Sequence, residues 1–193
     1  MKNIITLIIV LVGTLSCKAQ QVIIPVEKAI EYRDADSGVP DGVYLKDING
    51  LLNKYLGTWK GTVDNKNYTF VIIKYKNNLS RGVSQDELMI RYLITTSNGT
   101  VIEDTRSLSD DSSYVIKGDY FNKTASYYVS SYMGKNADCG QSGNLFITGT
   151  KLPTQIKLFL IPDKVMINIQ NCPGQKVADK LLPVENEVLL TKQ

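Results

Sequence analysis

The stretch Leu56-Gly57-Thr58-Trp59-Lys60-Gly61-Thr62 decides the fold, because the spacing of apolar residues changes across it. The apolar residues before it follow helical spacing, which predicts one or two turns of helix. They are Ile48, Leu51, Leu52 and Tyr55. The residues after it alternate with a period of two, which is typical of strands. We therefore interpret residues 58–63 as the first strand of a β-barrel, with Trp59, the only tryptophan, closing one end.

A series of short strands joined by polar turns is predicted after that stretch. Residues 87–96 alternate, and the Asn98-Gly99 that follows is the strongest short signal for a hairpin. Residues 68–75 are apolar on both faces, which indicates a strand covered on both sides. The further predicted strands are 101–106, 114–121, 124–131, 144–150, 155–161 paired with 164–170, and 187–192.

Strands at this spacing with hairpin connections favour an all-β fold in one domain. We predict an antiparallel up-and-down β-barrel of about 8–10 strands over residues 42–193, with a short N-terminal helical turn. Such a barrel has no exposed strand edges. Residues 20–41 are predicted to be an irregular tether. The carboxylates of Asp34, Asp36 and Asp41 are interpreted as a solvated loop in preference to a calcium site.

The composition excludes several classes of function. The chain has 22 basic and 19 acidic side chains, a net charge of +3 and no histidine. Histidine-dependent triads and histidine metal sites are therefore absent, and the sequence contains no Gly-x-Ser-x-Gly nucleophile motif. A weak positive charge without a basic patch gives no indication of nucleic-acid binding. We predict a protein that is not an enzyme, with no cofactor, no metal and no nucleic-acid partner.

The N-terminus has the layout of a secretory signal peptide over residues 1–19. A positive start is followed by the apolar run 4–12, which is too short for a bilayer span of ~20 residues. Thr14-Leu15-Ser16-Cys17 resembles a bacterial lipobox, although its first position is usually Leu. Two routes stay open: lipidation of Cys17 with anchoring to the bacterial envelope, or cleavage after Ala19 with release as a periplasmic or secreted protein.

The two remaining cysteines, Cys139 and Cys172, are predicted to form a disulfide. An even pair in an exported protein meets an oxidising compartment, and both cysteines lie in turn-like sequence. The bridge closes a loop of about 30 residues and contributes roughly 3 kcal/mol. The alternative is a pair of unlinked thiols.

Gly57-Thr58-Trp59 resembles the first strand of the lipocalin-like proteins, which carry Gly-x-Trp after a short helical turn. A closer resemblance is to a family of Bacteroidetes proteins of no assigned activity, often described as lipoproteins. The similar segments are Pro40-Asp41-Gly42-Val43-Tyr44, residues 56–61, Asp86-Glu87-Leu88 through Asn98-Gly99, and Leu190-Thr191-Lys192-Gln193. The resemblance implies a lipocalin-like barrel in the cell envelope. It also implies structural roles for Gly57 and Trp59, and a basic side chain, here Lys192, packed on the tryptophan.

Two functions remain open at this point. The first is a non-enzymatic binding module for a small apolar or amphipathic ligand inside the barrel. Its candidate lining residues are Tyr68, Phe70, Tyr92, Tyr127 and Phe159, although the sequence does not decide which strand face points inward. The alternative is a structural or protein-interaction lipoprotein with a packed, ligand-free barrel. In both cases we expect a monomer that meets the membrane only through a lipid anchor.

Overall fold

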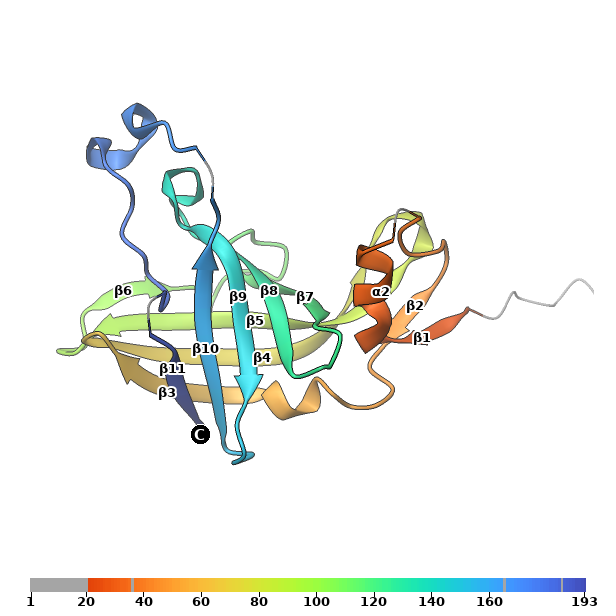
Figure 1. Cartoon of the computed structure of the whole chain (residues 1–193). Helices are drawn as coiled ribbons and strands as arrows, with labels where there is room; N and C mark the ends of the chain where they lie inside the picture. Colours follow the sequence, from red (N-terminus) through yellow and green to blue (C-terminus); the bar gives the residue numbers. More distant parts are fainter. Residues whose placement is uncertain (1–20, 36, 165, 185) are drawn as a thin grey trace, which may run out of the picture.

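Eight antiparallel strands close into a barrel in the computed structural model, which describes residues 21–35, 37–164, 166–184 and 186–193 (Figure 1). The predicted signal peptide, with Cys17 and Ala19, lies outside the described residues. In ring order the strands are β5 (Ser84–Thr96), β4 (Lys66–Asn78), β3 (Gly57–Val63), β11 (Val188–Lys192), β10 (Gln155–Pro162), β9 (Ser142–Gly149), β8 (Tyr127–Met133) and β7 (Ile116–Phe121). The ring closes where β7 returns to β5, with Met89 opposite Lys117 and Ile90 opposite Ile116. The predicted all-β antiparallel barrel is confirmed.

Strand β5 carries more partners than the other strands. One of its edges pairs with β4 along its whole length. The other edge pairs in succession with β2 (Tyr44–Lys46) in parallel, with β7, and with β6 (Val101–Asp104). β1 (Ile23–Pro25) then adds to β2 in parallel. The long strands β4 and β5 run out of the barrel to this side, where the N-terminal arm, residues 21–35 and 37–46, lies against them (Figure 1).

The arm is not the irregular tether that the sequence pattern predicts for residues 20–41. It contains the 3-10 turn η1 (Val26–Lys28) and the short helix α2 (Ala29–Arg33). Val26 is fully buried, Ala29 and Ile30 are nearly so, and Val26 and Ala29 belong to the same apolar core as the barrel strands. The helical spacing of these three residues was the missed signal.

Two further expectations differ from the structure. The helical turn predicted before Trp59 is reduced to η2 (Asn53–Tyr55): Leu52 and Tyr55 are fully buried, but Ile48 is exposed. No strand forms among the described residues of 164–170, where the turn η5 (Ile169–Asn171) lies instead. β10 already has β9 and β11 on its two edges, so no edge is left for that segment. The remaining 3-10 turns are η3 (Ser80–Gly82), η4 (Ala137–Cys139) and η6 (Pro173–Gln175).

Trp59 closes one end of the barrel. Its side chain is completely buried, and the indole Nε1 donates a hydrogen bond to the Tyr55 carbonyl at 2.7 Å. Lys192 Nζ lies 5.3 Å from the centroid of the indole ring. A Cβ at Gly57, where φ is +124°, would lie 2.9 Å from Lys192 Cε, and one at Gly61 would lie 2.4 Å from the Leu189 carbonyl oxygen. The two glycines around the tryptophan therefore allow β11 to approach β3.

The other end of the barrel is covered by two loops that the disulfide joins. Cys139 and Cys172 are bonded, with their Cα atoms 5.7 Å apart, which confirms the predicted pair. Ala178 N donates to the Cys139 carbonyl at 2.9 Å, and Tyr68 Oη donates to the Leu181 carbonyl at 3.2 Å. Leu182 from the same segment is buried in the core. The segment after the disulfide is thus tied across the strand ends.

Replacing the tryptophan tests its role in closing the barrel. We expect Trp59→Ala to lower the free energy of unfolding by about 3–5 kcal/mol, because a large buried side chain and its hydrogen bond are both lost. Urea unfolding followed by circular dichroism measures the change. Lys192→Met is the matched control, since it removes only a cation over the ring, worth about 0.5–1 kcal/mol. A loss under about 1 kcal/mol for Trp59→Ala contradicts the role as a plug.

Candidate functional site

Three of the five predicted lining residues lie inside the barrel. Tyr68, Phe70 and Tyr92 are 2%, 0% and 0% exposed and belong to the core. Their rings form a row, with centroids 6.1 Å apart between Tyr68 and Phe70 and 6.2 Å apart between Phe70 and Tyr92. Tyr132 of β8 continues the row at 6.5 Å from Tyr92. The interior is therefore strongly aromatic.

The other two predicted lining residues do not point inward. Tyr127 and Phe159 are half-buried on the outer face, because their neighbours Tyr128 and Leu158 belong to the core and successive strand residues face opposite sides. Both rings contact Phe146, at centroid distances of 5.5 and 5.1 Å. The prediction that they line the interior is wrong. The sequence alone does not decide whether Tyr127 or Tyr128 points into the barrel, because both are tyrosines.

Four hydroxyl groups inside the barrel have no hydrogen-bond partner in the part of the chain that the structure describes. They belong to Tyr55, Tyr128, Ser130 and Tyr132. Two of them have a polar neighbour outside hydrogen-bond geometry: Leu88 N beside the Tyr128 hydroxyl and the Tyr92 phenol beside that of Tyr132. Three come from alternate residues of β8 and so share its inner face. Ser130 is completely buried and Tyr132 is 3% exposed. A buried hydroxyl left unpaired costs about 1–3 kcal/mol, so this row of oxygens calls for an explanation.

A buried carboxylate lies inside the barrel, at the end that the disulfide-linked loops cover. Glu103 of β6 is 3% exposed and accepts a hydrogen bond from Tyr92 Oη at 3.1 Å. Lys135 Nζ lies 3.5 Å from its other oxygen. Burial, together with the charge of Glu103, raises the pKa of both Tyr92 and Tyr132. These phenols therefore remain protonated at neutral pH and can donate hydrogen bonds.

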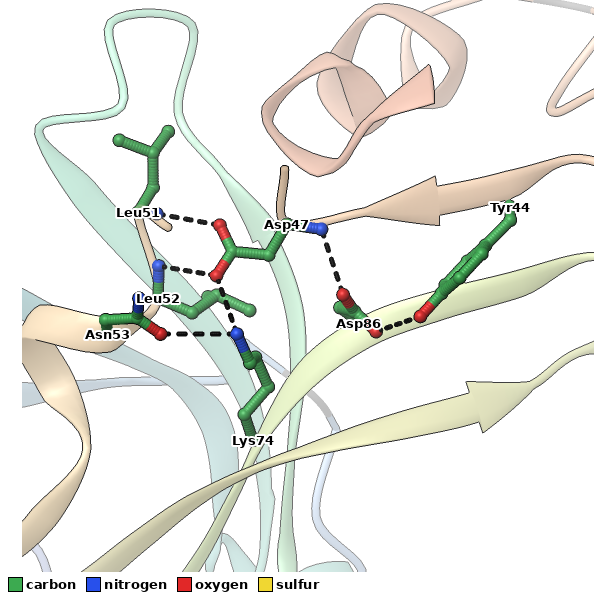
Figure 2. A network of polar contacts seen from close by, with 7 residues as sticks. All are labelled: Tyr44, Asp47, Leu51, Leu52, Asn53, Lys74 and Asp86. Atoms are coloured by element: carbon green, nitrogen blue, oxygen red, sulfur yellow. Dashed lines mark hydrogen bonds and ion pairs between the residues drawn. The ribbon is translucent and has the colours of Figure 1, made fainter. Parts of the chain in front are cut away.

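A second cluster of polar side chains lies where the arm meets the barrel (Figure 2). Asp47 accepts from Leu51 N at 2.7 Å and Leu52 N at 3.3 Å, which caps the turn below Trp59. Its Oδ2 lies 3.2 Å from Lys74 Nζ. Asp86 accepts from Asp47 N at 2.9 Å and from Tyr44 Oη at 2.6 Å.

This network links the arm, the turn and two barrel strands. Both carboxylates are buried and receive donors from the backbone or from neighbouring side chains. Burial and the hydrogen bond to Asp86 raise the pKa of Tyr44 to about 12, so the phenol remains a donor. We interpret the network as structural.

Removing the Asp47 carboxylate tests this interpretation. We expect Asp47→Ala to lower the free energy of unfolding by about 2–4 kcal/mol, because two backbone N–H groups and the Lys74 ammonium lose their partner. Chemical unfolding measures the loss. Glu187→Ala is the control, since its pair with Lys157 at 2.7 Å is exposed at both ends and is worth under about 1 kcal/mol. Equal effects of the two substitutions contradict the structural role.

A third polar cluster lies on the outer face of β5. Glu87 is 4% exposed and accepts from Tyr75 Oη at 2.8 Å and from Asn77 Nδ2 at 3.2 Å. Burial raises its pKa from 4.5 to about 7, although the two hydrogen bonds act in the opposite direction. Asp119, close by on β7, has its pKa raised as well, again mainly by burial.

The raised pKa of Glu87 makes stability depend on pH in a defined window. The folded state holds the Glu87 proton more tightly than the unfolded state, so this contribution is complete below about pH 4.5 and is lost as the pH rises through about 7. We expect Glu87→Gln to be more stable than the parent by about 3 kcal/mol at about pH 8 and nearly equal to it at about pH 4.5. Urea unfolding at both pH values measures the difference. A parent-minus-variant difference that does not change with pH contradicts the assignment.

Together these features define a closed, eight-stranded antiparallel β-barrel with a disulfide-linked cover, an aromatic interior and a row of interior hydroxyls. The chain belongs to a family of unknown function, DUF6705, whose model matches residues 1–193. No curated protein and no solved structure matches the chain. Among the described residues, no helix is long and apolar enough to cross a membrane. Membership in the family therefore assigns no activity.

Proposed function

We propose that this protein is an exported, non-enzymatic binding module that holds a small amphipathic ligand inside its barrel. One observation carries the proposal: the buried hydroxyls of Tyr55 and Ser130 have no partner among the described residues, and the Tyr132 hydroxyl has only the neighbouring Tyr92 phenol beside it. Buried polar groups are almost always hydrogen-bonded. A ligand with a polar group at this row would supply the missing partners.

The chemistry of the interior favours an amphipathic ligand over a purely apolar one. Small-molecule sites combine apolar and aromatic walls with a few polar groups that fix orientation. The row from Tyr68 to Tyr132 supplies such walls, and the inner face of β8 supplies the polar groups. An apolar ligand would leave the hydroxyls unpaired at the full cost of their desolvation.

The ligand would enter at the end that the disulfide loops cover. The opposite end is closed by Trp59, which packs within the barrel and is bonded to the turn below it. The disulfide end is closed by loops, which the disulfide and several hydrogen bonds tie to the strand ends. Loops open at lower free energy than packed core elements do.

Export is part of the proposal and rests on the sequence pattern of residues 1–19. The Cys139–Cys172 disulfide supports it, because disulfides persist in oxidising compartments. Export would take one of two forms: anchoring to the bacterial envelope through a lipidated Cys17, or release after cleavage behind Ala19.

A packed structural barrel is the second candidate, and the ring contacts favour it. Phe121 and Tyr128 meet edge to face at a centroid distance of 4.8 Å, and Tyr55 lies 6.5 and 6.3 Å from them. Contacts of this kind fill space near the Trp59 end of the interior. In this case the unpaired hydroxyls would be a net cost to stability.

Two substitutions on β8 separate the candidates. We expect 1-dodecanol, a neutral amphipathic probe, to change the fluorescence of Trp59 in a saturable manner. Tyr132→Phe should weaken its binding about tenfold, because one hydrogen bond to the ligand is lost. Tyr127→Phe removes a hydroxyl from the outer face of the same strand and should leave binding unchanged. Native mass spectrometry of protein from its own envelope should show a retained molecule, and acylation of Cys17 if the anchor forms.

The opposite result is equally defined. In a packed barrel, Tyr132→Phe removes an unpaired buried hydroxyl and should raise the free energy of unfolding by about 1 kcal/mol. That increase, with no retained molecule and no saturable response of Trp59, would reject the binding module in favour of the structural barrel.

A further inference from the structure

A cleft lies between the N-terminal arm and the barrel, with a cavity volume of about 590 Å³. One wall is formed by Tyr32 and Arg33 of α2. The cleft is also lined by Arg81 of the η3 turn, Gln85 of β5 and Asp119 of β7. The volume is within the range of small-molecule sites, about 300–1,000 Å³. Two guanidinium groups from distant parts of the sequence thus share one cleft.

A β-bulge sets the position of the first guanidinium. Gly118 pairs with Ser130 and Tyr120 pairs with Val129, so Asp119 is the extra residue of the bulge. Bulges redirect a side chain out of the regular alternation. Here the Asp119 carboxylate accepts from Arg33 Nη1 at 2.7 Å, and its backbone carbonyl accepts from Gln85 Nε2 at 2.6 Å.

The Arg33 guanidinium contacts both Tyr120 and Asp119 and still has N–H groups that make no hydrogen bond to the described residues. Its Cζ lies 4.4 Å from the centroid of the Tyr120 ring, in addition to the bond with Asp119. A guanidinium has five N–H donors, and one of them is used by the described residues. The side chain is 51% exposed. The group is therefore fixed in orientation, with its remaining donors available to the cleft.

Arg81 is placed by an unusual backbone conformation. Its φ of +56° is in the left-handed region, which residues other than glycine rarely adopt. Its carbonyl accepts from Gly42 N at 3.0 Å, which stabilises the turn. The side chain donates to the Val39 carbonyl at 3.3 Å and pairs with Asp41 at 3.2 Å, and it is 57% exposed. Most of its donors also make no hydrogen bond to the described residues.

The neighbouring cleft on the other side of α2 has the same volume of about 590 Å³ and also pairs its cations with carboxylates, but these cations are ammonium groups. There Lys28 pairs with Glu31 at 2.6 Å and Lys123 pairs with Asp34 at 3.0 Å. Ammonium groups are point charges, whereas two oriented guanidinium groups match the planar oxygens of a carboxylate or phosphate.

We propose that the cleft between Arg33 and Arg81 binds a small molecule through a carboxylate or phosphate group. Asp119 orients the Arg33 guanidinium, and Gln85 holds Asp119 in turn. The free edges of the two guanidinium groups donate to the ligand's oxygens. This site is on the outside of the barrel and does not depend on a ligand in the interior.

Titration with inorganic phosphate and, separately, with acetate tests the site, with the ionic strength held constant by sodium chloride. Nitrogen-15 NMR of the purified protein should give saturable shifts at the amides of Arg81, Gln85 and Asp119 with at least one anion, and the tighter of the two identifies the group. Arg81→Gln should raise the dissociation constant at least about tenfold. Arg33→Lys keeps the charge beside Asp119 and should also weaken binding, because the fork geometry is lost.

Arg106→Gln is the matched control, since Arg106 is a half-exposed arginine paired with Asp104 at 2.8 Å and is not among the cleft residues. It should leave both titrations unchanged. Shifts that do not saturate with either anion, or an equal effect of Arg106→Gln and Arg81→Gln, would overturn the proposal and leave only general charge screening.

Discussion

The structure depends on the short seam where β7 returns to β5, defined by Met89, Ile90, Ile116 and Lys117. Only glycine fits at the next position, Gly118. A Cβ would lie 2.3 Å from Tyr128 Oη and 2.8 Å from Leu88 N. Without a Cβ at this position β7 can approach the β5 backbone, and the ring of eight strands closes at these two residue pairs. An open sheet would expose two edges and the aromatic interior.

The seam also explains where the polar clusters lie. β5 meets β2, β7 and β6 along one edge, so the gap between β2 and β7 is covered by the arm instead of by a strand. Glu87 is buried there although its face points out of the barrel. The bulge at Asp119, immediately after the seam, turns a carboxylate towards Arg33 on the covering helix. Closing the barrel and building the cleft are therefore results of the same local geometry.

The sequence predicted what depends on periodicity and composition. Strand alternation, the Asn98-Gly99 hairpin, the tryptophan between glycines and the cysteine pair each give a local signal, and the barrel and the disulfide followed from them. The sequence did not predict which strand face points into the barrel. Tyr127 and Tyr128 are both aromatic, and Phe159 lies between two leucines, so neither face is distinguished there. The bulge at Asp119, the left-handed conformation of Arg81 and the row of unpaired interior hydroxyls depend on contacts between distant parts of the chain. No local pattern specifies these contacts.

The interior and the arm side are separated by a wall one strand thick, and this has an electrostatic consequence. Burial is the main cause that raises the pKa of the Tyr128 phenol, and the negative charges of Glu87 and Asp119 raise it further. Tyr128 faces inward whereas Glu87 faces outward, so the field of the outer cluster reaches the inner hydroxyl row. Little water lies between them to screen the charges, since both side chains are almost fully buried. Burial inside the barrel and the negative charges outside it thereby keep the Tyr128 hydroxyl a proton donor. A polar ligand group inside the barrel would meet that donor in a fixed protonation state.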